Sequence, residues 1–201
     1  MLKVAAFVLA GGLSSRMGTD KAAMVLGGKT LLQRAVETAS AASSRVCIVS
    51  SGERLAEEAT QLRVCTISDR FRDQGPLGGI HAALTSGHSE DTNFVLAVDM
   101  PFVSPDVVRY LIGLAAVSSA EVTLPKAEGR LHPLCGVYRR SFAVHAEKAL
   151  AQRRNKIEDA IPPAVLNVVA EDKLRFAGFD PGVFANLNTP EDFTRAQSRF
   201  I

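Results

Sequence analysis

The segment from Leu9 to Lys21 carries the strongest chemical signal in the chain. It reads Leu9-Ala10-Gly11-Gly12-Leu13-Ser14-Ser15-Arg16-Met17-Gly18-Thr19-Asp20-Lys21 and follows a short apolar run. Paired glycines let consecutive backbone N–H groups approach an anion closely. The Arg16 guanidinium can bind two phosphate oxygens, and Lys21 adds a point charge. The segment therefore predicts a triphosphate cradle, although its spacing matches neither GxxxxGK[ST] nor GxGxxG. An ordinary strand–helix turn with solvated charges is the alternative.

A carboxylate, Asp99, stands where a buried strand is expected to end. The apolar run Phe94–Val98 precedes it, and Pro101 forces a turn two positions later. The side chain is therefore expected at the ligand-binding edge of a sheet. Mg²⁺ that arrives with a triphosphate takes one or two protein carboxylates and keeps several waters. Asp99 is the predicted metal ligand and, with Arg16 and Lys21, a predicted catalytic residue. The alternative is an Asx turn that only ends the strand.

Further residues are expected at the same edge. Asp69 and Ser50 each follow or end an apolar run. Asp69 is either a group that points toward this ligand-binding edge or a cap of a turn or helix. The stretch Gly75–Gly79, which includes Gly78, is either a tight turn into a helix that starts near Ile80, or a surface on which backbone N–H and C=O groups read a flat purine.

Two polar groups stand out in the last third of the chain. Arg153-Arg154-Asn155-Lys156 is a dense basic cluster, and its plain interpretation is a solvated helix end. Asn186 and Asn188 alternate along an extended segment, so both side chains face the same way and their amides can donate and accept. A turn into the final helix explains Thr189 and Pro190, but it does not explain two aligned amides.

Alternating strands and helices must position these groups. Helices are predicted over Thr30–Ala42 and after the capping sequences Ser104-Pro105-Asp106 and Thr189-Pro190-Glu191-Asp192. The alternation predicts a three-layer α/β fold of Rossmann-like type, with a mostly parallel central sheet and helices on both faces, in a single domain spanning residues 1–201. Four of the strand candidates are almost wholly apolar, as in strands buried on both faces. The strand candidates are Val4–Leu9, Val46–Ser50, Val64–Ser68, Phe94–Val98, Val122–Pro125 and Leu134–Tyr138.

The composition excludes several classes of protein. The 201 residues include 23 Lys+Arg and 21 Asp+Glu, so there is no concentrated basic face for nucleic acid. No apolar run approaches the roughly 20 residues of a membrane-spanning helix. The first ten residues are expected to form a buried strand, not a secretion signal, and the expected location is the cytoplasm. Cys47, Cys65 and Cys135 are accordingly expected to be buried thiols, and the histidines show no metal-ligand spacing.

The glycine-rich segment resembles the signature loop of the molybdenum cofactor guanylyltransferases, which are nucleotidyltransferases with a Rossmann-like α/β fold. Further motifs follow in the family's order over nearly the whole chain. They are Asp69 with Gly75-Pro76-Leu77-Gly78-Gly79, Asp99 in Val98-Asp99-Met100-Pro101, His132-Pro133, and Asn186-Leu187-Asn188-Thr189-Pro190.

The resemblance implies a role for each of these positions. The nucleotide contacts that it implies are Leu9, Ala10, Gly11, Gly12, Lys21, Ser50, Asp69, Gly78 and Asp99, and the acceptor contacts are Arg153, Arg154, Asn186 and Asn188. Ser50 departs from the family pattern, because close members often carry Asn at this position.

The implied reaction is transfer of GMP from GTP to molybdenum-bound molybdopterin, with Mg²⁺ as cofactor and pyrophosphate as the second product. The terminal phosphate of the acceptor would attack the α-phosphorus in line, without a covalent protein intermediate. The partners implied are these two small-molecule substrates, together with transient contacts to molybdenum-insertion proteins or apo-molybdoenzymes. Neither nucleic acid nor a membrane is an expected partner.

Other functions compete with this one. The first is a cytidylyltransferase, or another small-molecule nucleotidyltransferase of the same fold, although CTP-using relatives more often resemble Leu-Ala-Ala-Gly where this chain has Gly11-Gly12. The second is a non-catalytic nucleotide-binding regulator, which would not need Lys21, Asp99 and the paired asparagines together. An NAD-dependent oxidoreductase is disfavoured, because Ser50 and Ser51 stand where an acidic ribose ligand is expected.

Overall fold

The computed structural model describes residues 3–11, 20–41, 43, 45–51, 55–69 and 74–199. The strands are β1 (Val4–Leu9), β2 (Val25–Leu26), β3 (Lys29–Thr30), β4 (Arg45–Ser50), β5 (Cys65–Ser68), β6 (Thr92–Ala97), β7 (Val122–Ala127), β8 (Arg130–Leu131), β9 (Cys135–Arg139) and β10 (Leu166–Val169). The α-helices are α1 (Leu31–Ser40), α2 (Ala56–Leu62), α3 (Gly75–Thr85), α4 (Pro105–Ala116), α5 (Ala143–Ala151), α6 (Ile157–Ala160), α7 (Glu171–Phe176) and α8 (Pro190–Gln197). Short 3₁₀ helices are η1 (Lys21–Ala23), η2 (Arg140–Phe142), η3 (Pro163–Val165) and η4 (Pro181–Phe184).

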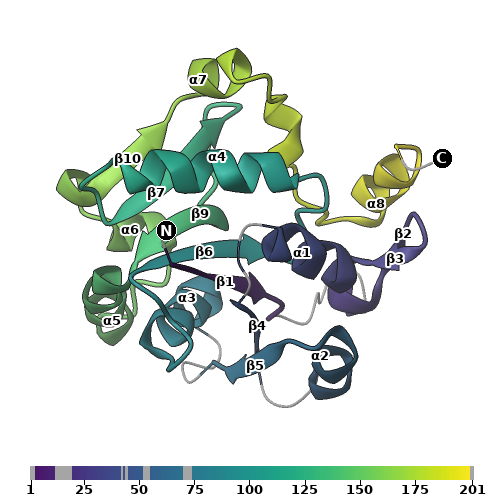
Figure 1. Cartoon of the computed structure of the whole chain (residues 1–201), viewed down its shortest axis with the longest axis horizontal. Helices are drawn as coiled ribbons and strands as arrows, with labels where there is room; N and C mark the ends of the chain where they lie inside the picture. The colour runs from purple at the N-terminus through teal and green to yellow at the C-terminus, as the bar shows by residue number, and fades with distance from the viewer. Residues whose placement is uncertain are drawn as a thin grey trace.

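The central sheet is mostly parallel, as predicted. Its strand order is β10-β7-β9-β6-β1-β4-β5, with β8 paired to β7 (Figure 1). On this path β9 runs antiparallel to β6 and β7, and the other neighbours are parallel. Leu9 lies level with Val49 of β4 and Ala97 of β6. The carboxyl ends of β1, β4, β5 and β6 therefore meet at one edge of the sheet.

Helices cover both faces of this sheet, which confirms the predicted layers. Side chains alternate along β1, so Ala6 and Val8 pack into the core beneath α1 and α4. Phe7 and Leu9 pack into the second core, beneath α3 and α5. In Figure 1 the two pairs of helices lie on opposite sides of the strands. None of the helices among the described residues combines the length and the apolar character needed to cross a bilayer.

Local capping explains where the predicted helices begin. The Thr30 hydroxyl accepts from the Gln33 N–H (3.1 Å), and the Gln33 side chain accepts from the Thr30 N–H (2.9 Å). Ser104 caps α4 in front of a proline, and Thr189 forms a second capping box with Asp192. Each of these interactions spans three residues, so the sequence alone predicts it.

The start of α3 differs from the prediction. The helix begins at Gly75, not near Ile80, so Gly78 and Gly79 are helical and buried. A Cβ on Gly79 would lie 3.4 Å from the Leu9 side chain and 3.7 Å from the Val49 side chain. The interpretation of Gly75–Gly79 as a turn that precedes the helix is therefore wrong, because these residues form the first turns of α3. A Cβ at Gly79 would make only ordinary van der Waals contacts with β1 and β4.

The expectation for the cysteines is also corrected. Cys47 and Cys65 face each other across β4 and β5, with Cα atoms 4.5 Å apart, and form a disulfide. The two residues are separated by 18 positions, so no CxxC pattern marks them, and the register of the sheet brings them together. Cys135 is a buried free thiol, as expected, and burial raises its pKa strongly.

His132 holds the segment that leads into α8. Its ring stacks on Phe184 at the end of η4, with centroids 5.2 Å apart, and its Nε2 lies 3.3 Å from the Ala127 carbonyl oxygen. Burial lowers the pKa of His132, because the imidazolium form would lose its hydration there. The ring thereby packs the residues before Asn186 against the sheet.

The packing of β9 gives a testable prediction. A Cβ on Gly136 would overlap the Leu124 side chain and lie 3.1 Å from the Thr123 carbonyl oxygen. Gly136→Ala should therefore lower the free energy of unfolding by about 1–3 kcal/mol, measured by urea denaturation. Gly113, exposed in α4 with open space around it, is the matched control. Gly113→Ala should raise the free energy of unfolding by about 0.4–1 kcal/mol, and an equal effect of the two changes would contradict this packing.

The buried imidazole gives a second prediction. Because the pKa of His132 is lowered from 6.5 in the folded chain, the unfolded chain binds more protons below that pH. The free energy of unfolding should therefore fall as the pH decreases through 6.5. His132→Phe, which keeps a ring against Phe184, should flatten this dependence in urea denaturation on both sides of that pH. The same slope in the variant and the parent would show that another group causes it.

Candidate active site

Asp99, two residues beyond β6, is bonded through both of its carboxylate oxygens. Oδ2 lies 2.8 Å from Lys21 Nζ, and Oδ1 accepts from Asn186 Nδ2 at 3.2 Å. Lys21 Nζ also donates to Asn188 Oδ1 at 3.0 Å. The Lys21 and Asp99 side chains are only 17% and 15% exposed, so their attraction is less screened than that of a surface pair. These four residues, here called the Asp99 cluster, come from three distant segments.

Backbone pairing fixes Asp99 and the two asparagines relative to one another. The Val98 N–H donates to the Leu9 carbonyl (3.0 Å), so the pairing between β6 and β1 continues one residue beyond the end of β6. The Asp99 carbonyl accepts from the N–H of Leu187 (2.9 Å), a buried residue between the two asparagines. Asn186 then reaches Asp99 directly, and Asn188 reaches it through Lys21.

The capping box of α8 restrains the same segment. The Asp192 carboxylate accepts from the N–H groups of Asn188 and Thr189, each at 3.1 Å. The Asn188 N–H is the main cause of the lowered pKa of Asp192. The residues that begin the last helix therefore also position an amide of the cluster.

Lys21 is positioned by a short turn. Oδ1 of Asp20 accepts from the Ala22 N–H at 3.0 Å, and this contact starts η1 with Lys21 as its first residue. Lys21 thus lies where the glycine-rich segment ends, next to the strand ends.

Several predicted nucleotide contacts line the same edge. The Ala10 N–H donates to the Val49 carbonyl (2.9 Å), and the Asp69 N–H donates to the carbonyl of buried Ser50 (3.1 Å). Leu9 ends β1 and Gly11 is exposed just beyond it, whereas Gly78 is enclosed in α3. Gly12 and Arg16 lie outside the described residues.

The two predicted acceptor arginines are not members of the Asp99 cluster. Arg153 and Arg154 occupy the exposed turn after α5, where their N–H groups donate to the carbonyls of Leu150 and Ala149. Among the described residues, no hydrogen bond or ion pair joins either guanidinium to the cluster. Their role in binding an acceptor stays a prediction.

Gln74 carries a buried polar atom that the sequence did not indicate. It precedes the first turn of α3, and its Oε1 is buried without a hydrogen-bond partner. An unsatisfied buried acceptor is costly unless a ligand donor satisfies it. No motif marks this position, because the signal is the burial of one atom.

The oxygen atoms of the cluster are suitable ligands for a hard cation. Asp99 Oδ2 and Asn188 Oδ1 converge on one positive charge, the Lys21 ammonium. Mg²⁺ prefers oxygen ligands and uses one or two carboxylates beside waters and phosphate oxygens. These two residues could hold Mg²⁺ once Lys21 transfers its hydrogen bonds to a phosphate.

Sequence comparisons identify relatives over nearly the whole chain. Residues 6–162 match the family model described as the MobA-like NTP transferase domain. A "Probable molybdenum cofactor guanylyltransferase" of Pelotomaculum thermopropionicum is 32% identical over 98% of this chain and 93% of its own length. The molybdenum cofactor guanylyltransferase of Syntrophotalea carbinolica is also 32% identical, over 94% of this chain and 89% of its own.

A solved structure agrees with these matches. Molybdopterin-guanine dinucleotide biosynthesis protein A from Archaeoglobus fulgidus superimposes with a TM-score of 0.82 at 30% sequence identity, and 98% of each chain is covered. The similarity thus extends over nearly the whole of both chains. With its mostly parallel sheet and its cluster at the strand ends, the chain belongs to the MobA-like NTP transferase family.

Proposed function

We propose that this protein transfers GMP from GTP to molybdenum-bound molybdopterin and releases pyrophosphate. The observation that carries the proposal is the convergence of Lys21, Asp99, Asn186 and Asn188 at the carboxyl ends of the strands. Relatives at 32% identity over nearly their whole length are named for this activity. A cation, a carboxylate and two amides in contact are the groups that a triphosphate and a phosphorylated acceptor require.

The proposed reaction is an in-line displacement at phosphorus. A terminal phosphate oxygen of molybdopterin forms a bond to the α-phosphorus of GTP. The bond between the α-phosphorus and the oxygen that bridges it to the β-phosphorus breaks. Pyrophosphate leaves with the electron pair. The attacking phosphate is already mostly ionised at neutral pH, so the protein needs no strong base. Positioning and charge neutralisation are then the chain's main contributions.

Lys21 is the charge that neutralises the departing phosphates. Its ammonium is held by Asp99 and Asn188, so it is already oriented at the strand ends before a nucleotide binds. Transfer of these hydrogen bonds to the β- and γ-phosphates keeps the ammonium paired throughout. Gly11, with Gly12 and Arg16, completes the phosphate cradle in this proposal.

Asp99 and Asn188 are the proposed magnesium ligands, because their oxygens already face one cation. When bound, Mg²⁺ neutralises phosphate charge and polarises the α-phosphoryl group. Asn186 holds the second carboxylate oxygen of Asp99 and so fixes the direction in which the first one points.

The acceptor is proposed to bind on the side of the segment 186–188. Asn186 and Asn188 would orient its phosphate, and Arg153 and Arg154 would attract its anionic end. Cytoplasmic location and transient transfer of the product to molybdenum-insertion proteins or apo-molybdoenzymes are part of the same proposal. The alternative nucleotide is CTP, with the same fold and the same Asp99 cluster.

Two substitutions test the roles within the cluster. Lys21→Ala or Asp99→Ala should reduce GTP- and Mg²⁺-dependent pyrophosphate release by at least about 100-fold, since each removes a charge at the reacting phosphates. Lys29→Ala is the matched control, because Lys29 pairs with Glu37 on the surface and should leave the rate at the parental value. A near-parental rate in either cluster variant would overturn its assigned role.

Nucleotide selectivity is tested by thermal unfolding with Mg²⁺ and each of GTP, CTP, ATP and UTP. A ligand at a hundred times its Kd stabilises the folded state by about 2.7 kcal/mol, a shift of about 5–10 °C for a chain of this size. The expected result is a shift with GTP that is weakened in Lys21→Ala. A shift confined to CTP would contradict the proposed guanylyltransferase activity and indicate a cytidylyltransferase.

A further inference from the structure

Cys47, Cys65 and His88 form a cluster at the opposite end of the strands from Asp99. The two sulfurs and one imidazole nitrogen all lie within 4.8 Å of one another. Cys65 is the first residue of β5 and Cys47 the third of β4, whereas Ser50 and Asp69 mark the other ends of these strands. The cluster is therefore separate from the proposed nucleotide site.

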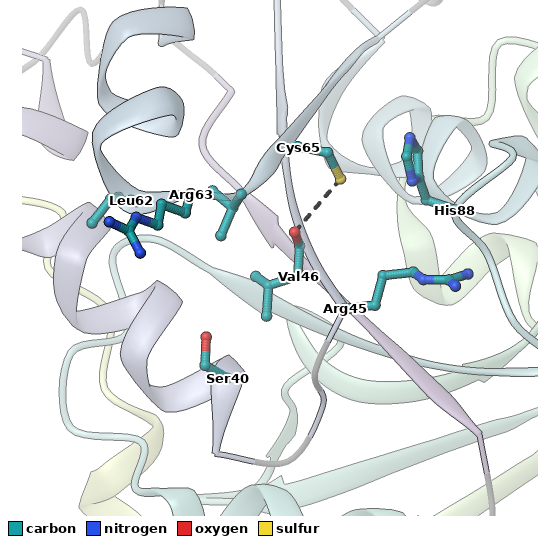
Figure 2. Close-up of a pocket in the computed structure, with 8 residues that line it drawn as sticks. Ser40, Arg45, Val46, Leu62, Arg63, Cys65 and His88 are labelled. Atoms are coloured by element: carbon teal, nitrogen blue, oxygen red, sulfur yellow. Dashed lines mark hydrogen bonds between the residues drawn. The ribbon is translucent and has the colours of Figure 1, made fainter.

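Burial in this cluster increases from His88 to Cys47. Cys47 is fully buried, Cys65 half-buried and His88 exposed in the turn after α3. The Cys65 sulfur lies 3.5 Å from the Val46 carbonyl oxygen, and Figure 2 shows it beside His88. A hollow of about 330 Å³ adjoins it, lined in part by Arg45 and Arg63. Small solutes thus reach the outer side of the cluster, while its inner side is closed.

We propose that Cys47, Cys65 and His88 bind one zinc ion when the disulfide is reduced. Two thiolates and an imidazole form a ligand set that binds Zn²⁺ in preference to Mg²⁺. Tetrahedral coordination at ordinary Zn–S and Zn–N bond lengths separates the ligand atoms by roughly 3.5–3.8 Å. The three atoms here already lie within 4.8 Å of one another. Once the S–S bond is reduced, rotation about the Cα–Cβ bonds lets the two sulfurs separate to this spacing. A water in the adjoining hollow supplies the fourth ligand.

The conversion balances in atoms, electrons and charge. Two molecules of a small thiol supply two electrons and two protons, which gives two cysteine thiols and one small-molecule disulfide. Zn²⁺ then displaces both thiol protons and binds the neutral imidazole. The resulting centre has no net charge, so the guanidinium groups of Arg45 and Arg63 do not oppose it. Arg45 is in addition paired with Glu90 at 2.9 Å.

The position of the cluster indicates a structural role for the metal. β5 is an edge strand of four residues, paired on one side with β4. A metal held by Cys47, Cys65 and His88 would join β4, β5 and the turn after α3 at one point. The bound metal would take the place of the Cys47–Cys65 disulfide in surroundings where small thiols keep these two cysteines reduced.

Cobalt substitution tests the site directly. The full chain, reduced with a phosphine that does not bind metal, is titrated with Co²⁺ alone and then with Zn²⁺. The expected result is one equivalent of Co²⁺ per chain, thiolate-to-cobalt charge-transfer absorption and the visible bands of a tetrahedral ion, all lost on addition of Zn²⁺. The same chain kept in the disulfide form should show none of these bands.

Matched variants decide whether these residues are the ligands. His88→Gln alters an exposed side chain, so the fold is kept, and it should weaken Co²⁺ binding by at least about tenfold. Cys65→Ser should abolish the charge-transfer absorption. His145→Gln and Cys135→Ser are the controls and should bind as the parent does. Absence of charge-transfer absorption in the reduced parent, or parental affinity in His88→Gln, would overturn the proposal.

Discussion

The position of Asp99 at the end of a fully buried strand is the constraint on which the site depends. Every residue of β6 is buried, and β6 lies between β1 and β9 near the middle of the sheet. A carboxylate at this point needs partners, because an unpaired charge at a half-buried site is costly. Lys21 and Asn186 meet that need through its two oxygens, and the Asp99 carbonyl accepts from Leu187. One residue thus sets where two distant segments must go.

Peripheral packing keeps the second of these segments in place. Phe184 is fully buried and stacks on His132, and Leu187 is buried three residues later. Asp192 then holds the backbone of Asn188 from inside the last helix. An apolar anchor therefore lies on one side of the asparagines and a helix cap on the other. Their amides are held at the strand ends with little freedom, which favours the preorganised geometry that phosphoryl transfer requires.

Much of this arrangement can be predicted from the sequence, because its causes are local. The caps at Thr30, Ser104 and Thr189 act within three residues, and an apolar run followed by Asp99 indicates a strand that ends at the ligand edge. The shared direction of Asn186 and Asn188 follows from simple alternation.

What sequence reasoning could not supply is the contact between Lys21 and Asn188, which are 167 positions apart. Register likewise, not spacing, brings Cys47 to Cys65. The helical conformation of Gly75–Gly79 runs against the low helix propensity of glycine. The sequence does not indicate β10, because Asn167 interrupts its apolar pattern and three of its four residues are not fully buried.

The wide separation of Lys21 from Asn188 also has a consequence for synthesis on the ribosome. β1 cannot acquire its partner β6 until about half of the chain has been translated, and contacts of such range make folding slow. The strand ends assigned to the nucleotide, up to Asp99, can assemble from that first half. Asn186 and Asn188 join them only when translation has passed residue 188. A nascent chain therefore has Lys21 long before it has the amide that orients it, so the complete Asp99 cluster is among the last parts of the molecule to form.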